Sequence, residues 1–155
     1  LRSLTFEELC RYPLFAALPP EHPLAGTKRF GLRDLAGEPL VAYRRSDYPE
    51  YHEFLAELFQ PFGGTPPIAE ELDGATSLIA AVEARRGIAL VPSCLACLAG
   101  PRLKLRELQP APPPIIVGVA YKPGGLCSVG QRFVKLLREI KSPKPATQIG
   151  NHQMP

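Results

Sequence analysis

Apolar residues along the chain recur in two alternating patterns: short continuous runs, and runs spaced three to four positions apart. The short runs predict strands at residues 14–18, 40–43, 68–72, 88–91 and 115–121, and an alternation of apolar and polar residues predicts a strand at 103–108. The helical spacing predicts helices at residues 49–59, 75–85 and 128–140, with short helical turns at 5–11, 32–35 and 93–98. Because strands and helices alternate, the pattern predicts an α/β fold with a mixed or parallel sheet flanked by helices.

Two capping signals predict where helical segments begin. Thr5 and Glu8 have the spacing of a capping box, which predicts the helical turn at 5–11. Asp47 and Glu50 have the same spacing and predict the start of the helix over 49–59.

The helix over 75–85 carries signals at both of its ends. Asp73 or Thr76 is expected to cap its first turn. Gly87 is expected to take the left-handed conformation that ends the helix, because glycine adopts that conformation without a steric cost.

The composition narrows the class of protein. The 155 residues include 18 Lys+Arg and 15 Asp+Glu, a net charge of +3, which is a weak field for binding nucleic acid. Hydrophobic residues make up 45% of the chain, enough for a folded core, and no run is long enough for a membrane span. The start at Leu1 lacks Met and an apolar signal, so we expect a cut inside a longer, cytoplasmic protein.

The spacing of the cysteines and histidines does not match a metal site, a cofactor site or a catalytic site. We therefore expect no metal, no cofactor and no enzymatic activity. Cys10 and Cys127 lack the paired spacing of a zinc site. Cys94 and Cys97 have the spacing of a redox motif, but we expect both to be reduced and buried on one helix face as small hydrophobic side chains. His52 is expected on the polar side of its helix, and the chain contains no recognisable Ser–His–Asp pattern.

Two strand-to-helix turns are candidate binding loops. In the first, Tyr43 ends a buried strand, and Arg44, Arg45 and Ser46 lead from it into a helix. Helix N-termini attract anions and arginine binds carboxylate or phosphate in a bidentate manner, so this turn is a candidate anion site; the alternative is that both arginines are solvated.

The second turn contains two hydroxyl side chains near the start of a helix. Its candidate ligand-binding residues are Asp73, Ala75, Thr76 and Ser77. These side chains either donate to a ligand or only cap the helix locally. Open α/β sheets bind ligands at the carboxyl ends of their strands, where both turns are expected to lie.

Several motifs occur in the order found in one family. They are the His-Pro-Leu-Ala turn within 18–25, the Asp-Leu-Ala-Gly-Glu-Pro-Leu-Val segment at 34–41, the helix running into Gly-Ile-Ala-Leu-Val-Pro at 82–92, the strand end at 119–122 and the amphipathic helix at 131–140. Their order and spacing resemble the effector-binding domain of LysR-type transcriptional regulators, mostly its second subdomain. The resemblance covers about Leu4 to Ile140, and the family usually has Gly where this chain has Arg85.

The resemblance implies a fold like that of type 2 periplasmic binding proteins, in which a small ligand lies between two α/β lobes. It implies that residues 1–122 form the second lobe, that 123–140 form a helix returning toward the first lobe, and that 141–155 form a disordered tail. The N-terminal helix-turn-helix and the first part of the effector domain have no counterpart in this sequence. The chain is therefore expected to be a fragment.

The function implied is ligand sensing by a transcriptional regulator, not catalysis. A small anionic effector would contact the two candidate loops, and DNA would be bound only through the absent N-terminal domain. Family members form homo-oligomers through their effector domains, for which the exposed face of the helix over 51–59 is a candidate surface. The alternative is a solute-binding protein of a transport system with the same fold.

Overall fold

A computed structural model describes residues 4–139 and divides them into two compact units. Residues 13–113 form the unit called here the lobe, and residues 4–12 with 114–139 form the ribbon unit. The predicted boundary at residue 122 differs from this division, because residues 4–12 and 114–122 belong to the ribbon unit. The assignment of residues 1–122 to the second lobe of an effector-binding domain stays a prediction. The predicted tail at 141–155 lies outside the described residues.

The centre of the lobe is a three-stranded antiparallel sheet with strand order β5-β2-β6. Its strands are β2 (Leu14–Leu18), β5 (Ala89–Pro92) and β6 (Lys104–Glu107). Ala16, Ala17 and Leu18 of β2 are fully buried, as expected for a central strand covered on both faces.

A second pair of strands extends this sheet. Strand β3 (Leu40–Tyr43) pairs in parallel with β4 (Ile68–Leu72). A parallel bridge between Leu40 and Ile88, and a 2.8 Å hydrogen bond from the Val41 N–H to the Ile88 carbonyl, join β3 to β5. The strands thus follow the order β4-β3-β5-β2-β6, with β2 alone running in the opposite direction, and the predicted α/β fold with a mixed sheet is confirmed.

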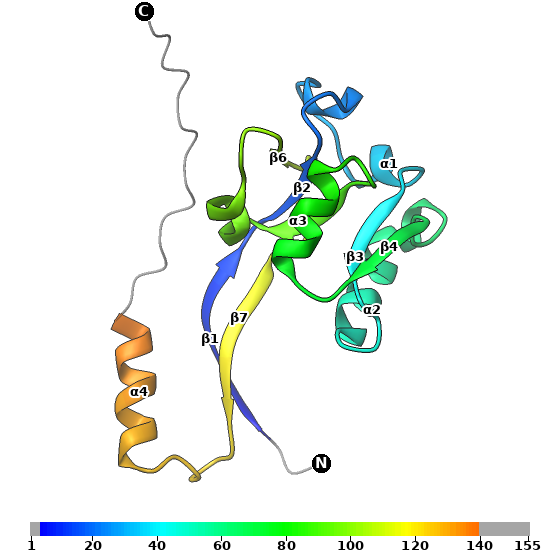
Figure 1. Ribbon diagram of the computed structural model, residues 1–155. Coiled ribbons are helices and arrows are strands. Elements are labelled where there is room, and N and C mark those ends of the chain that lie inside the picture. The colour runs from blue at the N-terminus through cyan, green and yellow to red at the C-terminus, as the bar shows by residue number, and fades with distance from the viewer. Residues whose placement is uncertain (1–3, 140–155) are drawn as a thin grey trace, which may run out of the picture. The chain divides into compact units, whose positions relative to one another are not determined.

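Helices cover both faces of the lobe's sheet (Figure 1). The α-helices are α1 (Leu32–Leu35), α2 (Pro49–Phe59) and α3 (Ala75–Glu83), and the 3-10 helices are η1 (Pro23–Ala25), η2 (Gln60–Phe62) and η3 (Ser93–Leu98). Helix α3 packs against β2, β3 and β5, whereas α2 lies behind β3 and β4 in Figure 1. Leu78, Ile79 and Val82 of α3 enter the core, each contributing about 1.5–3 kcal/mol by burial.

The helices form where their apolar spacing predicts, but the predicted caps are wrong. Tyr48, not Asp47, is the N-cap of α2, and Gly74 is the N-cap of α3; neither N-cap residue makes a side-chain capping hydrogen bond. Asp47 and Asp73 instead bind neighbouring side chains in their own loops. Local side-chain partners therefore compete successfully with the helix N–H groups.

The C-terminus of α3 also differs from the prediction. Arg85, with φ of 62°, takes the left-handed position expected for Gly87. The Arg85 N–H bonds the Val82 carbonyl at 2.9 Å and the Arg86 N–H bonds the Ala81 carbonyl at 3.0 Å, which is the Schellman pattern. Gly87 has another role, because a Cβ atom there would lie 2.6 Å from the Pro39 carbonyl oxygen.

The ribbon unit contains β1 (Thr5–Tyr12), β7 (Ile115–Tyr121) and α4 (Ser128–Glu139). Strands β1 and β7 pair antiparallel, with a bulge between Glu8 and Cys10. The helical turn predicted at 5–11 is wrong, because pairing with β7 overrides the local capping signal. Within residues 4–139, the structure contains no helix with the length and apolar character needed to span a bilayer.

Candidate functional site

The two candidate loops leave the sheet side by side. Strands β3 and β4 are parallel, and Tyr43 at the end of β3 is paired with Leu72 at the end of β4. The Arg44 N–H donates to the Leu72 carbonyl at 2.8 Å, so the contact continues beyond the strands. The loop of residues 43–47 (the Arg44 loop) and that of residues 73–77 (the Asp73 loop) therefore share the carboxyl edge of the sheet, where open α/β folds bind ligands.

The Arg44 loop is a tight turn held by its own polar groups. The Asp47 and Tyr48 N–H groups both donate to the Arg44 carbonyl, at 3.1 and 3.0 Å. The Asp47 carboxylate accepts from the Ser46 hydroxyl at 2.9 Å and lies 3.5 Å from the Arg44 guanidinium. The Arg44 side chain is 51% exposed, so this long ion pair leaves most of its donors available.

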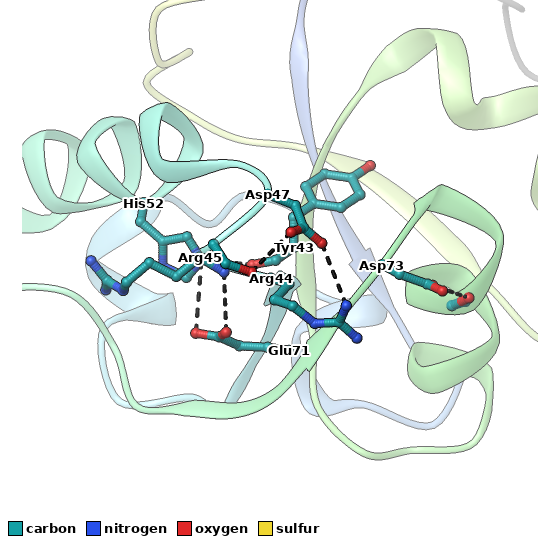
Figure 2. Close-up of polar contacts among 9 residues, drawn as sticks. Tyr43, Arg44, Arg45, Asp47, His52, Glu71 and Asp73 are labelled. Atoms are coloured by element: carbon teal, nitrogen blue, oxygen red, sulfur yellow. Dashed lines mark hydrogen bonds and ion pairs between the residues drawn. The ribbon is translucent and has the colours of Figure 1, made fainter.

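Arg45 is placed differently from Arg44, although the two are adjacent. The Arg45 backbone N–H donates to the Glu71 carboxylate of β4 at 3.1 Å. Figure 2 shows the Arg44 side chain pointing to the side on which Asp73 lies, whereas the Arg45 side chain points the opposite way. The structure thus brings Arg44, but not the Arg45 side chain, toward the Asp73 loop.

The Asp73 loop leads into α3, whose first backbone N–H groups receive no side-chain cap from the N-cap residue. Its N-cap residue is Gly74, which has no side chain for capping, and the Asp73 carboxylate accepts from the Ser77 hydroxyl at 2.9 Å. Ala75 is half-buried and Thr76 is exposed. The expectation that Asp73 or Thr76 caps α3 is wrong, and the first N–H groups of a helix are a favourable place for an anion.

His52 lies beneath the Arg44 loop, in contrast to its predicted place on the polar side of its helix. Its side chain is fully buried, and its Nε2 lies 2.6 Å from the Tyr43 carbonyl oxygen and 3.9 Å from Glu71. Because a carbonyl only accepts, Nε2 must donate, which assigns the ring proton. His52 therefore ties α2 to the end of β3.

A group of tyrosines supports the same loop. The Tyr43 ring lies 4.9 Å from that of Tyr48 and 5.0 Å from that of Tyr51. The Tyr51 hydroxyl donates to the Leu90 carbonyl at 3.2 Å, and burial raises the pKa of Tyr51 well above its ordinary range. Burial also raises the pKa of Tyr43, with smaller effects from the neighbouring Tyr48 and Cys94 side chains. Both phenols thus stay neutral.

The net electrostatics of the edge are mixed. Arg44 and Arg45 contribute two positive charges, and Asp47, Glu71 and Asp73 contribute three negative ones. Among residues 4–139, no three His, Cys, Asp or Glu side chains are arranged to hold a metal ion. Arg44 and the first N–H groups of α3 are the groups at this edge whose chemistry suits an anion.

A surface pocket lies at the other end of these strands. It has a volume of about 250 Å³ and is lined by Pro19, Glu21, His22, Glu38, Arg85 and Ile88, among others. Its polar side chains lie in pairs: the Arg85 guanidinium is 2.8 Å from the Glu21 carboxylate, and the His22 ring is 3.4 Å from the Glu38 carboxylate. This pocket was not predictable from the sequence, because its residues come from three separate turns.

The expectation that Cys94 and Cys97 are buried is wrong. Both are exposed, in the 3-10 helix that follows β5. The Cys97 thiol donates to the Cys94 carbonyl at 3.3 Å.

Comparison with known proteins identifies similar chains. The family profile described as "LysR substrate binding domain" matches residues 1–141. The HTH-type transcriptional regulator TtuA of Agrobacterium vitis is 35% identical over 98 residues, which are 63% of this chain and 32% of TtuA. The chain thus spans about a third of the length of this curated relative.

Two solved structures share the fold. The BenM effector-binding domain with its effector benzoate superposes with a TM-score of 0.70 and 21% identity, over 91% of this chain and 67% of that one. The regulatory domain of CcmR from Synechocystis PCC6803, in complex with 2-PG, has a TM-score of 0.77 and 20% identity, over 93% and 70% of the two chains. At these identities the likeness concerns the fold alone.

Proposed function

Because the chain belongs to the LysR substrate binding domain family, we propose that it senses a small anionic molecule on behalf of a transcriptional regulator. The effector would bind at the shared edge of the Arg44 and Asp73 loops. The observation that supports this proposal is the parallel pairing of β3 and β4, which brings the Arg44 loop and the Asp73 loop to the same edge of the sheet. A guanidinium and helix N–H groups are the donors that a carboxylate or phosphate prefers.

The ligands of similar proteins support an anion. Benzoate, the effector in the BenM structure, is a carboxylate. Among residues 4–139, the side-chain partner of the exposed Arg44 guanidinium is Asp47 at 3.5 Å, so an incoming carboxylate can displace it at little cost. The other proposed contacts to the effector are made by Tyr43, Ser46, Ala75, Thr76 and Ser77.

The remaining proposals are supported by the family alone. The whole regulator would bind DNA through a separate helix-turn-helix domain, as the name of TtuA indicates for that protein. It would act in the cytoplasm as a homo-oligomer, without catalysing a reaction. The exposed face of α2 is the proposed pairing surface.

The test compares two adjacent arginines. Isothermal titration of the chain with sodium benzoate, as a carboxylate probe, is carried out for the wild type, Arg44→Ala and Arg45→Ala. Each variant removes one positive charge from the same loop, but only Arg44 points toward Asp73. We expect Arg44→Ala to weaken binding at least about tenfold, equivalent to about 1.4 kcal/mol, and Arg45→Ala to weaken it far less.

Equal losses in the two variants would show that charge alone matters and would remove Arg44 from the site. The same comparison decides the role predicted for the Arg45 side chain. Unchanged affinity in Arg44→Ala would contradict the proposed site altogether.

A further inference from the structure

Cys94 and Cys97 lie at the same edge of the sheet as the proposed ligand loops. Strand β3 is flanked by β4 on one side and by β5 on the other, and all three run in the same direction. The chain leaves β5 at Pro92 and enters η3, which carries both cysteines. The carboxyl ends of three neighbouring parallel strands thus lead into the Asp73 loop, the Arg44 loop and the two thiols.

The 3-10 conformation brings the two thiols onto one line. A 3-10 helix has three residues per turn and rises about 2.0 Å per residue, so residues three apart are eclipsed with Cα atoms about 6 Å apart. Cysteines joined in disulfides have Cα separations of roughly 4.4–6.8 Å. The hydrogen bond from the Cys97 thiol to the Cys94 carbonyl, at 3.3 Å, already directs the Cys97 sulfur toward Cys94.

Both thiols are open to solvent, as a redox-active cysteine pair requires. We propose that Cys94 and Cys97 form a redox-active dithiol that hydrogen peroxide oxidises to an intramolecular disulfide, and that this change alters the Arg44 loop. One thiol attacks the peroxide oxygen and becomes a sulfenic acid, releasing water. The second thiol then displaces a second water, so the pair loses two electrons and two protons while the peroxide is reduced to two molecules of water.

The core transmits the change to the Arg44 loop. Leu95, which lies between the two cysteines, packs against the same buried cluster as Tyr43, the first residue of that loop. Burial raises the pKa of Tyr43 most, the Tyr48 side chain adds to this effect, and the Cys94 side chain makes a smaller contribution in the same direction. The Cys94 thiol therefore lies close to this phenol. A regulatory meaning for this coupling rests on the proposed function, but the chemistry of the pair does not.

The disulfide is expected to be easily reversed. Eclipsed residues keep their Cβ atoms about 6 Å apart in an ideal 3-10 helix, whereas a disulfide needs about 3.5–4.5 Å. The turn must tighten to close the bond, and strained disulfides are the more reducible ones. This property distinguishes a switch from a structural bridge.

The experiment treats the full chain with a small excess of hydrogen peroxide and identifies the product by peptide mass spectrometry. Cys127→Ser is the common background, because backbone N–H groups of Gly130 and Val129 lower the pKa of the Cys127 thiol and make it a competing site. We expect the peptide containing Cys94 and Cys97 to lose two hydrogens and to regain them with glutathione. Cys94→Ser or Cys97→Ser in the same background should abolish the loss.

The coupling has a readout that needs no ligand. Amide NMR shifts of residues 43–47 are expected to change on oxidation of the background protein and to stay constant in the Cys94→Ser variant. Independent over-oxidation of each cysteine to sulfinic acid, or disulfides joining two chains, would overturn the dithiol. Constant shifts at 43–47 after disulfide formation would overturn the coupling, whereas a failure of benzoate to bind would affect only the proposed function.

Discussion

Arg85 takes a backbone conformation that glycine adopts more easily, so Arg85→Gly is expected to stabilise the lobe. With φ of 62°, Arg85 lies in the left-handed region, which costs a residue with a side chain roughly 1–2 kcal/mol. The substitution removes this cost while the two Schellman hydrogen bonds, which are backbone bonds, remain. The extra freedom of glycine in the unfolded chain offsets about 0.5 kcal/mol of the gain.

Arg85→Gly also removes the ion pair between Arg85 and Glu21, which lowers the expected gain in stability. Its side chains are 65% and 61% exposed, so solvent screens the interaction and its contribution is about 0–0.5 kcal/mol. The net expectation is a stabilisation of about 0–1.5 kcal/mol. At this chain length, such a change raises the melting temperature by up to about 6 °C.

Urea unfolding followed by circular dichroism measures this difference, with Arg85→Ala as the matched control. Alanine removes the same ion pair but keeps the left-handed strain, so it is expected to be equal to or slightly less stable than the wild type. If Arg85→Gly were no more stable than Arg85→Ala, the strain assigned to this position would be refuted.

Three further predictions follow from individual contacts. Gly87→Ala places a Cβ atom 2.6 Å from the Pro39 carbonyl oxygen and should lower the free energy of unfolding by about 1–3 kcal/mol. Gly37→Ala is the control, because Gly37 has open space around it and the substitution should change stability little. Equal urea midpoints for the two variants would contradict the close approach at Gly87. His52→Leu removes the hydrogen bond to the Tyr43 carbonyl and should lower the free energy of unfolding by about 1–3 kcal/mol. His52→Gln keeps a donor and should lower it less. A leucine variant as stable as the wild type in urea unfolding would show that the bond contributes nothing. The Arg138 guanidinium lowers the pKa of Glu7 below its ordinary 4.5, so the stabilisation is present above pH 4.5 and is lost as the pH falls through the lower folded-state pKa. The unfolding free energy of Glu7→Gln should therefore fall less steeply with acid than that of the wild type, and parallel pH profiles would argue against the pair.

The elements that depend on local periodicity were predictable from the sequence. The stripe of Leu55, Leu58 and Phe59 defines α2, and the run at 40–43 is the buried strand β3. Both patterns follow directly from one face being covered by the core. The edge that carries the candidate loops was predictable for the same reason, since each loop follows a predicted strand.

Features that depend on distant partners were not predictable. The capping signal of Thr5 and Glu8 could not reveal that Thr5 pairs with Tyr121 in the ribbon unit. The hydrogen bond from the Arg45 N–H to the Glu71 carboxylate could not be predicted either, because it requires the pairing of β3 with β4. His52 is an exception: it shares the i, i+3, i+7 face of Leu55 and Phe59, so the helical spacing contained the signal.

The central claim is that an anion binds where the Arg44 and Asp73 loops meet. Titration of the isotope-labelled chain with benzoate, followed by amide NMR shifts, locates the binding surface residue by residue. Binding at this edge predicts that the largest shifts cluster at Arg44, Ser46, Thr76 and Ser77. Shifts concentrated around the pocket of His22, Glu38 and Arg85, or spread evenly over the lobe, would contradict it.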